Sequence, residues 1–187
     1  GLEVKRKEIK SMTYTENEVI IVDKKDADQA HMKTGHNSPG YDFEKYTEFL
    51  IGNKIFGQGG FSSRLMKEIR SEKGFVYSIY SGVSYNKNGG VYYIDTKVNP
   101  EKAREVLSDV KKEMMAIKNA EKEITEKEVS ENINLYNGLL PSNYKYPINI
   151  INDDIYETEL LEKEGDYLNN FIDEYNNLTA SEVQSVM

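Results

Sequence analysis

The pattern of apolar and polar residues predicts two short strands and a helix in the first third of the chain. Residues 19–22 (VIIV) form an uninterrupted apolar run, typical of a strand, and residues 27–35 give a weaker strand signal. Between residues 41 and 56, aromatic and aliphatic side chains recur at helical spacing. Gly57 follows directly, where a glycine can end a helix at positive φ.

Residues 56–83, with the sequence FGQGGFSSRLMKEIRSEKGFVYSIYSGV, join a glycine loop, a helix and a strand. A helix is expected over residues 64–73, because a serine pair suited to N-capping precedes it. Gly74 then turns the chain into a strand that begins near Tyr77 and alternates apolar with small residues. The permissive and capping residues of the loop are, in order, Gly57, Gly59, Gly60, Ser62 and Ser63.

The second half of the chain predicts a hairpin followed by helices. Residues 86–90 (NKNGG) are typical of a tight turn, and residues 91–98 alternate as the returning strand. Asn99 and Pro100 predict one helix start, and the capping box of residues 125–128 predicts another. Further helices are predicted over residues 148–161, over residues 166–175 and from Thr179, which opens a second capping box.

Strands that come in adjacent pairs favour an α+β fold, with a mainly antiparallel sheet covered by helices on one face. We predict a single domain over residues 17–187, preceded by a linker or exposed edge over residues 1–16, where charges alternate with few apolar residues. The chain begins with glycine, and it stops soon after its last helix begins. Both features indicate a domain cut from a longer protein.

Composition narrows the function classes. The 187 residues are 38% hydrophobic and 30% charged, which suits one globular core. The net charge of −8 argues against general nucleic-acid binding, because phosphate contacts need a basic surface. The sequence has no cysteine, which excludes disulfides, thiolate metal sites and a cysteine nucleophile. No apolar run reaches the length of a membrane helix.

The sequence offers neither a zinc site nor a serine nucleophile. Its two histidines, His31 and His36, lack neighbouring carboxylates at ligand spacing, and no His-x-x-Glu-His motif is present. Ser62 and Ser63 lie outside a Gly-x-Ser-x-Gly elbow and have no histidine nearby, so capping is their expected role.

The glycine loop allows three interpretations. A phosphate-binding loop would end in Gly-Lys-Ser/Thr after a strand, and neither feature is present. The two remaining interpretations are a tight turn between helices and a loop that touches extended substrate, where a missing Cβ lets another backbone approach.

Arg70 and Tyr77 lie seven residues apart across Gly74, so the end of a helix and the start of a strand could bring both side chains to one rim. Arginine offers a fixed charge and five donors for peptide carbonyls or a carboxylate, and a tyrosine hydroxyl can donate to an oxyanion. The alternative is that Arg70 pairs on the surface with Glu68, Glu72 or Glu113 and that Tyr77 lies in the core.

The pattern GG-F-SSRL-EIR-KG-Y, followed by a glycine hairpin, a strand, NPEKAREVLSDVKKEM and ITEKEV, resembles the C-terminal domain of insulinase/pitrilysin-type zinc metallopeptidases. These inverzincins include mitochondrial processing peptidase. The resemblance implies two homologous α+β halves that close like a clamshell. One half binds zinc through His-x-x-Glu-His and a distant glutamate, and the other, which lacks the motif, completes the chamber.

By match of motif, the resemblance assigns Arg70 and Tyr77 to holding the substrate backbone and the oxyanion near the metal. It assigns Gly57, Gly59 and Gly60 to a substrate-binding loop, which is shorter here than in the processing peptidase. It implies no metal in this chain, zinc in a partner half on the same or a separate polypeptide, and a peptide substrate. A homodimer of the fragment is a further possible assembly.

Two functions stay open at this point. The chain is either the substrate-binding, non-metal half of a zinc endopeptidase of bacterial type, inactive alone, or an inactive structural or interaction subunit of the same fold. The sequence leaves both the bacterial cytoplasm and the periplasm open as compartments.

Overall fold

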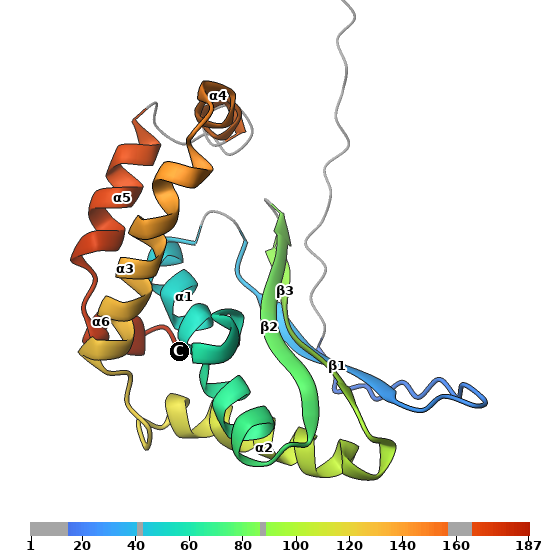
Figure 1. The fold of residues 1–187 in the computed structure, drawn as a ribbon. Coiled ribbons are helices and arrows are strands. Elements are labelled where there is room, and N and C mark those ends of the chain that lie inside the picture. Colours follow the sequence, from blue (N-terminus) through green and yellow to red (C-terminus); the bar gives the residue numbers. More distant parts are fainter. Residues whose placement is uncertain (1–14, 41–42, 87–88, 157–165) are drawn as a thin grey trace, which may run out of the picture.

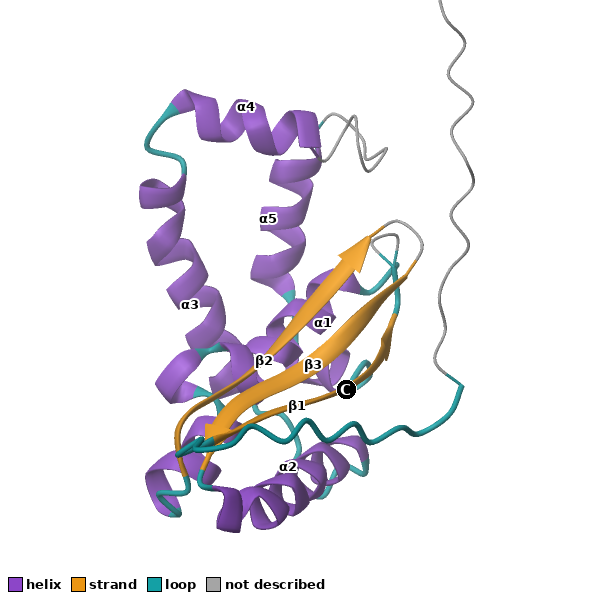
Figure 2. Cartoon of the chain, turned by 90° about the vertical axis from the view of Figure 1, so that its right-hand side faces the viewer, coloured by secondary structure: helices purple, strands orange, loops and turns teal. Residues whose placement is uncertain are grey.

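The structure, a computed structural model (Figure 1), describes residues 15–40, 43–86, 89–156 and 166–187. Within these residues, an antiparallel sheet has the strand order β1-β3-β2, formed by β1 (Ala30–Ser38), β2 (Val76–Asn86) and β3 (Gly89–Val98). Helices pack behind one face of this sheet, which stands in front of them in Figure 2. The α+β architecture predicted from the sequence is confirmed.

Side chains of the central strand β3 alternate between a face of the sheet that is buried against the helices and a face that is open to solvent. Tyr92, Ile94, Thr96 and Val98 are buried against the helices, as the alternation predicted. The open face includes Tyr80 and Val91, which are exposed. The hairpin between β2 and β3 is confirmed by their antiparallel register, although residues 87–88 of its turn lie outside the described residues.

The first helix, α1, covers Tyr46–Asn53 and continues as a π-helical segment, η1, over Lys54–Gln58. Gly57 lies inside η1 instead of ending a helix, so the predicted cap position was wrong, and the positive φ of the loop occurs at Gly60. The remaining helical elements are η2 (Gly60–Ser62), η3 (Met66–Glu72), η4 (Pro100–Lys102), α2 (Ala103–Lys118), α3 (Glu126–Asn143), α4 (Pro147–Ile155), α5 (Tyr167–Asn177) and α6 (Ala180–Gln184).

Local capping signals correctly predicted three helix starts. The Asn99 side chain accepts a hydrogen bond from the Glu101 amide at 3.0 Å ahead of η4 and α2. Thr125 and Thr179 form complete capping boxes at α3 and α6. Part of one predicted helix, residues 157–161, lies outside the described residues.

The predicted strand at residues 19–22 is wrong. The segment forms no ladder with any described strand, and its four apolar side chains are 75–87% exposed. Strand formation needs a hydrogen-bonding neighbour, and an apolar run alone does not supply one. The second predicted strand is confirmed as β1, although β1 extends beyond residue 35 to Ser38.

The core lies between the sheet and the helices α1, η1, η3, α2 and α3. Its largest fully buried side chains come from elements far apart in the sequence. They include Ile51, Phe56, Leu65, Ile69, Ile79, Ile94, Val106, Val110, Ile117, Val129 and Tyr175. No helix among the described residues is long and apolar enough to cross a membrane.

Candidate functional site

Arg70 and Tyr77 are brought together by a wide helical turn and a bulged strand. Arg70 lies in the π-helical segment η3, and the Gly74 amide donates to the Arg70 carbonyl oxygen at 3.0 Å. Gly74 has a φ of 67°, so the chain can reverse into β2. The register of β2 shifts between Val76 and Ile79, and Tyr77 within this irregularity is 78% exposed. The alternative that Tyr77 belongs to the core is therefore wrong.

Two aromatic rings contact the guanidinium group of Arg70. Its central carbon lies 4.4 Å from the ring centroid of Phe61 and 5.2 Å from that of Tyr77. Both distances are within the range of a cation–π interaction. Among the described residues, no ion pair joins Arg70 to a carboxylate. With respect to the described residues, the guanidinium N–H groups are therefore available to an external acceptor.

Lysines occupy two of the carboxylates that were candidates for pairing with Arg70. Lys73 contacts Glu68 at 3.2 Å and Asp109 at 2.7 Å, and Lys122 contacts Glu113 at 2.7 Å. The hydrogen bond to Asp109 raises the pKa of Lys73, and the hydrogen bond to Glu113 raises the pKa of Lys122. The third candidate, Glu72, is exposed and also forms no ion pair with Arg70 among the described residues.

The three glycines of the loop have different environments. A Cβ on buried Gly57 would lie 2.5 Å from the Ser81 hydroxyl, so this glycine permits close packing of η1 on β2. Gly59 packs against the Lys54 carbonyl oxygen, which accepts a hydrogen bond from its amide at 2.9 Å. Gly60 is exposed, has a φ of 62° and faces open space.

The serine pair does not cap the following helix, so that prediction was wrong. Ser62 Oγ donates to the Gly59 carbonyl oxygen at 2.9 Å, and Ser63 Oγ donates to the Gly60 carbonyl oxygen at 2.7 Å. Both hydroxyls therefore stabilise the glycine turn that precedes them. The buried position of Ser63 makes this turn part of the packed structure.

Arg64 lies at the start of the helical segment of residues 64–72, which also contains Arg70, and its guanidinium group makes four hydrogen bonds. Its Nε and Nη2 atoms each donate to a different carboxylate oxygen of Glu128 at 2.8 Å, and Nη1 and Nη2 donate to the carbonyl oxygens of Lys122 and Glu123 at 2.7 Å. Burial alone would raise the pKa of Glu128, but the hydrogen bonds from Arg64 and Thr125 lower it to about 2. Arg64 thereby ties this segment to the first turn of α3.

The two histidines, His31 and His36, do not form a common metal site. His31 Nε2 lies 2.8 Å from Asp95 Oδ1, and His36 Nδ1 lies 2.7 Å from the carbonyl oxygen of the next residue. The part of the chain that the structure describes contains no group of three or more His, Cys, Asp or Glu residues that could hold a metal ion. The donor set of these residues does not fit zinc.

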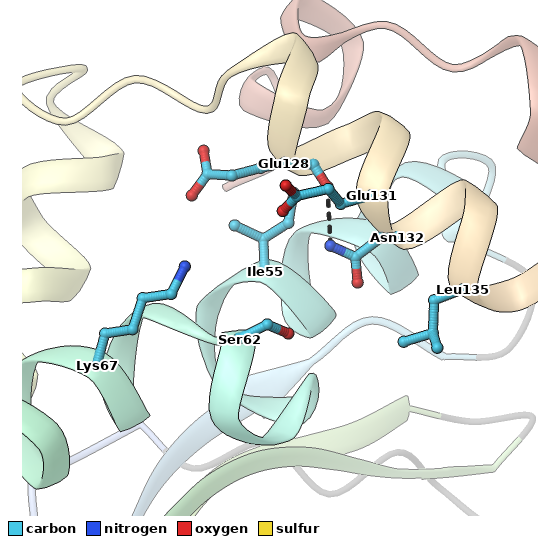
Figure 3. Close-up of a pocket in the computed structure, with 7 residues that line it drawn as sticks. All are labelled: Ile55, Ser62, Lys67, Glu128, Glu131, Asn132 and Leu135. Atoms are coloured by element: carbon cyan, nitrogen blue, oxygen red, sulfur yellow. Dashed lines mark hydrogen bonds between the residues drawn. The ribbon is translucent and has the colours of Figure 1, made fainter.

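A small cleft lies between the glycine turn and α3 (Figure 3). Lys67, Glu131 and Leu135 contribute its charged and apolar walls, and Asn132 Nδ2 donates to the Glu128 carbonyl oxygen at 2.8 Å. Its lining also includes Ile55 and Ser62. Neither Arg70 nor Tyr77 is among the lining residues, so the cleft is separate from their exposed surface.

Sequence reasoning gave no role to Phe61 or Arg64. Phe61 occurs within the GG-F-SSRL pattern, which carries no signal of its contact with Arg70. Arg64 and Arg70 carry the same side chain within one helical segment, so the sequence alone could not separate an anchored arginine from an unpaired one.

The sequence and the fold of this chain are similar to those of known proteins. Residues 3–136 match the family model of the peptidase M16 inactive domain. A structure from Pseudomonas fluorescens, described as a peptidase M16 inactive domain, aligns at a TM-score of 0.77 and 25% identity, covering 86% of this chain and 38% of that chain. A protease structure from Helicobacter pylori shows the same fold at a TM-score of 0.75 and 17% identity, covering 87% of this chain and 38% of that chain.

A similar sequence occurs in an uncharacterized zinc protease of Mycobacterium tuberculosis. It is 31% identical over 83 residues, which cover 44% of this chain and 19% of that protein. The chain spans about a fifth of the length of the curated relatives it matches.

Proposed function

The chain belongs to the peptidase M16 inactive-domain family, and we propose that it is the substrate-binding half of a zinc-dependent endopeptidase whose metal is held by another half. The observation that carries the proposal is the surface formed by Arg70 and Tyr77. It combines an arginine without a carboxylate partner among the described residues with a tyrosine that is 78% exposed. A fixed positive charge beside an exposed hydroxyl suits a peptide backbone.

The two side chains have separate roles in this proposal. Arg70 donates hydrogen bonds to carbonyl oxygens of the extended substrate and thereby fixes its register. Tyr77 donates its hydroxyl hydrogen to the oxygen of the scissile carbonyl, where negative charge develops during attack by water.

In this proposal zinc is held by the other half, and it is consistent with this that the described residues form no cluster that could hold a metal ion. When bound there, the metal would polarise the scissile carbonyl and lower the pKa of an attacking water. The partner in the proposal is a homologous zinc-bearing half, on the same polypeptide or on a separate subunit. We propose no role for a homodimer of this chain, and the isolated chain is expected to be inactive.

The glycine loop joins the proposed site through Gly60. This residue is exposed beside Phe61 and has open space where a Cβ would lie, so an extended backbone can approach it. Gly57 and Gly59 contribute to substrate binding indirectly, because they let the loop lie close to β2 and η1.

The test compares Tyr77→Phe and Arg70→Ala in the complete two-half enzyme, with a fluorogenic peptide as substrate. Tyr77→Phe keeps the ring beside Arg70 and removes only the hydroxyl, so we expect kcat to fall by about 10²- to 10³-fold. Arg70→Ala removes charge-assisted hydrogen bonds, and we expect kcat/KM to fall by about 10- to 10²-fold.

Tyr80→Phe is the matched control. Tyr80 lies on the same strand and is 45% exposed, but its ring contacts Tyr93 on the open face of the sheet and not Arg70. It should leave kcat/KM unchanged. Unchanged turnover in Tyr77→Phe and Arg70→Ala as well would reject the assigned roles and favour a structural or interaction subunit.

A further inference from the structure

Phe61 is a large apolar residue that the fold leaves 69% exposed next to the arginine of the proposed site. Its ring is closer to the Arg70 guanidinium carbon than the ring of Tyr77 is, at 4.4 Å against 5.2 Å. Single exposed apolar residues are common on protein surfaces and need no explanation alone. The short contact to an otherwise unpaired guanidinium is what distinguishes Phe61.

Phe61 lies in a turn that several hydrogen bonds stabilise. The Ser63 amide donates to the Gly60 carbonyl oxygen at 3.1 Å, and the serine hydroxyls donate to the carbonyl oxygens of Gly59 and Gly60. The positive φ of Gly60 sets the direction of the chain immediately before the ring. Hydrogen bonds on both sides of Phe61 therefore fix the place from which its side chain extends.

A ring contact holds an arginine without using its donors. An ion pair with a carboxylate would occupy the N–H groups that a substrate needs, whereas a cation–π contact leaves those groups free. An unrestrained arginine loses rotamer freedom when a ligand binds, and holding it in place beforehand reduces that loss. Nearby carboxylates are engaged elsewhere, since Glu68 and Asp109 both pair with Lys73.

We propose that Phe61 is a positioning residue of the substrate site, which together with the ring of Tyr77 holds the Arg70 guanidinium in place with its N–H groups open to substrate. The consequence for catalysis rests on the proposed function. The restraint on Arg70 does not, and it can be measured in this chain without a substrate or a metal.

The first experiment measures the order of the Arg70 side chain by the heteronuclear ¹H–¹⁵N NOE of its Nε–H group. The chain supplies its own references, because Arg64 is anchored by four hydrogen bonds and Arg104 is exposed. In the unmodified chain, Arg70 should resemble Arg64. Phe61→Leu keeps an apolar side chain but removes the aromatic ring, and Arg70 should then approach Arg104.

Phe61→Tyr keeps the ring and should restore the order of Arg70. The melting temperature should be the same in all three proteins, because Phe61 is exposed. An Arg70 signal that stays ordered in Phe61→Leu would overturn the proposal, and so would an Arg70 signal as disordered as Arg104 in the unmodified chain.

The second experiment places Phe61→Leu in the complete two-half enzyme. We expect kcat/KM to fall by about fivefold, which corresponds to about 1 kcal/mol, mainly through a higher KM. The same change should have no further effect in an Arg70→Ala background, because Phe61 acts through Arg70. Additive losses in the double variant, or a full loss of kcat with unchanged KM, would contradict a positioning role.

The two proposals fail in different ways. If the proposed function is wrong, Arg70→Ala and Tyr77→Phe leave turnover unchanged, while the NOE experiment still decides whether Phe61 holds Arg70. If only the further inference is wrong, those two variants lose activity and Phe61→Leu keeps both wild-type kinetics and an ordered Arg70.

Discussion

Arg64 and Arg70 are six residues apart in one helical segment and have opposite surroundings. The Arg64 side chain is 12% exposed and makes four hydrogen bonds to α3 and the loop before it. Arg70 is contacted by two exposed rings and by no carboxylate among the described residues. Arg64, at the N-terminal end of the segment, is hydrogen-bonded to α3 and the loop before it. Arg70, near the C-terminal end, has its charge at the surface.

The difference shows how a fold can hold a charged group ready for a ligand. The hydrogen bonds of Arg64 hold one end of the segment, and the ion pair of Lys73 with Asp109 holds the other end, so the Arg70 side chain is not needed to place the segment. Of the carboxylates that were candidates for pairing with Arg70, Glu68 is paired with Lys73 and Glu113 with Lys122, and Glu72 forms no ion pair with Arg70 among the described residues. An unpaired arginine near a firmly held one is therefore a better indicator of a binding site than an arginine alone.

The largest effect on stability is expected for Arg64→Met. The change leaves the carboxylate of Glu128, which is 21% exposed, without its partner and removes the donors to two carbonyl oxygens. We expect the free energy of unfolding to fall by about 3 kcal/mol, which lowers the melting temperature by about 9 °C for a chain of this size. Differential scanning calorimetry measures both quantities.

Arg64→Lys is the matched control for this prediction. It keeps the positive charge but cannot reach both carboxylate oxygens of Glu128 with a planar fork, so its loss should be intermediate. A loss in Arg64→Met no larger than that of an ordinary surface substitution would show that α3 is held by other contacts.

The next largest effect is expected in the pH dependence of the stability that the Arg64–Glu128 ion pair contributes. The pKa of Glu128 is lowered from an ordinary value of 4.5 to about 2 in the folded chain. Its charge therefore stabilises the fold fully above pH 4.5, and this contribution is lost as the pH falls from 4.5 towards 2. Glu128→Gln should cost about 2 kcal/mol at pH 7, and the difference from the unmodified chain should vanish near pH 2.

Glutamine can still accept from the Thr125 amide, but it replaces one oxygen that accepts from Arg64 with an NH2 group, so the pH dependence of the penalty identifies the contribution of the charge. Glu131→Gln on the same helix is the control, because Glu131 makes only an exposed pair with Lys127 at 3.8 Å. Its effect on the melting temperature should be small at every pH. A penalty for Glu128→Gln that persists unchanged at pH 2 would rule out the charge as its source.

The sequence predicted features that depend on neighbouring residues. Both threonine capping boxes, the turn at Gly74 and the alternation along β3 follow from residues within a few positions of one another, and all are present. The α+β class followed in turn from the order of these elements. Local chemistry decides such features before the chain packs.

The failures involve partners far away in the sequence. The run at residues 19–22 has the composition of a strand but no neighbouring strand among the described residues. The sequence left Tyr77 open between an exposed rim and the core, and its exposure goes with a shift in the register of β2 against β3. The roles of Arg64 and Phe61 depend on α3 and on Arg70, and no spacing in the sequence records those contacts.

The smallest effect on stability is expected for Arg70→Met, which is compared with Arg64→Met. Arg70→Met keeps a long flexible side chain that can still pack on the rings of Phe61 and Tyr77. No ion pair with a described residue is lost, so we expect the free energy of unfolding to change by less than about 1 kcal/mol. Calorimetry beside Arg64→Met measures the contrast directly. If the two substitutions cost the same, Arg70 is a second structural anchor, and the argument that its donors are kept for a substrate fails.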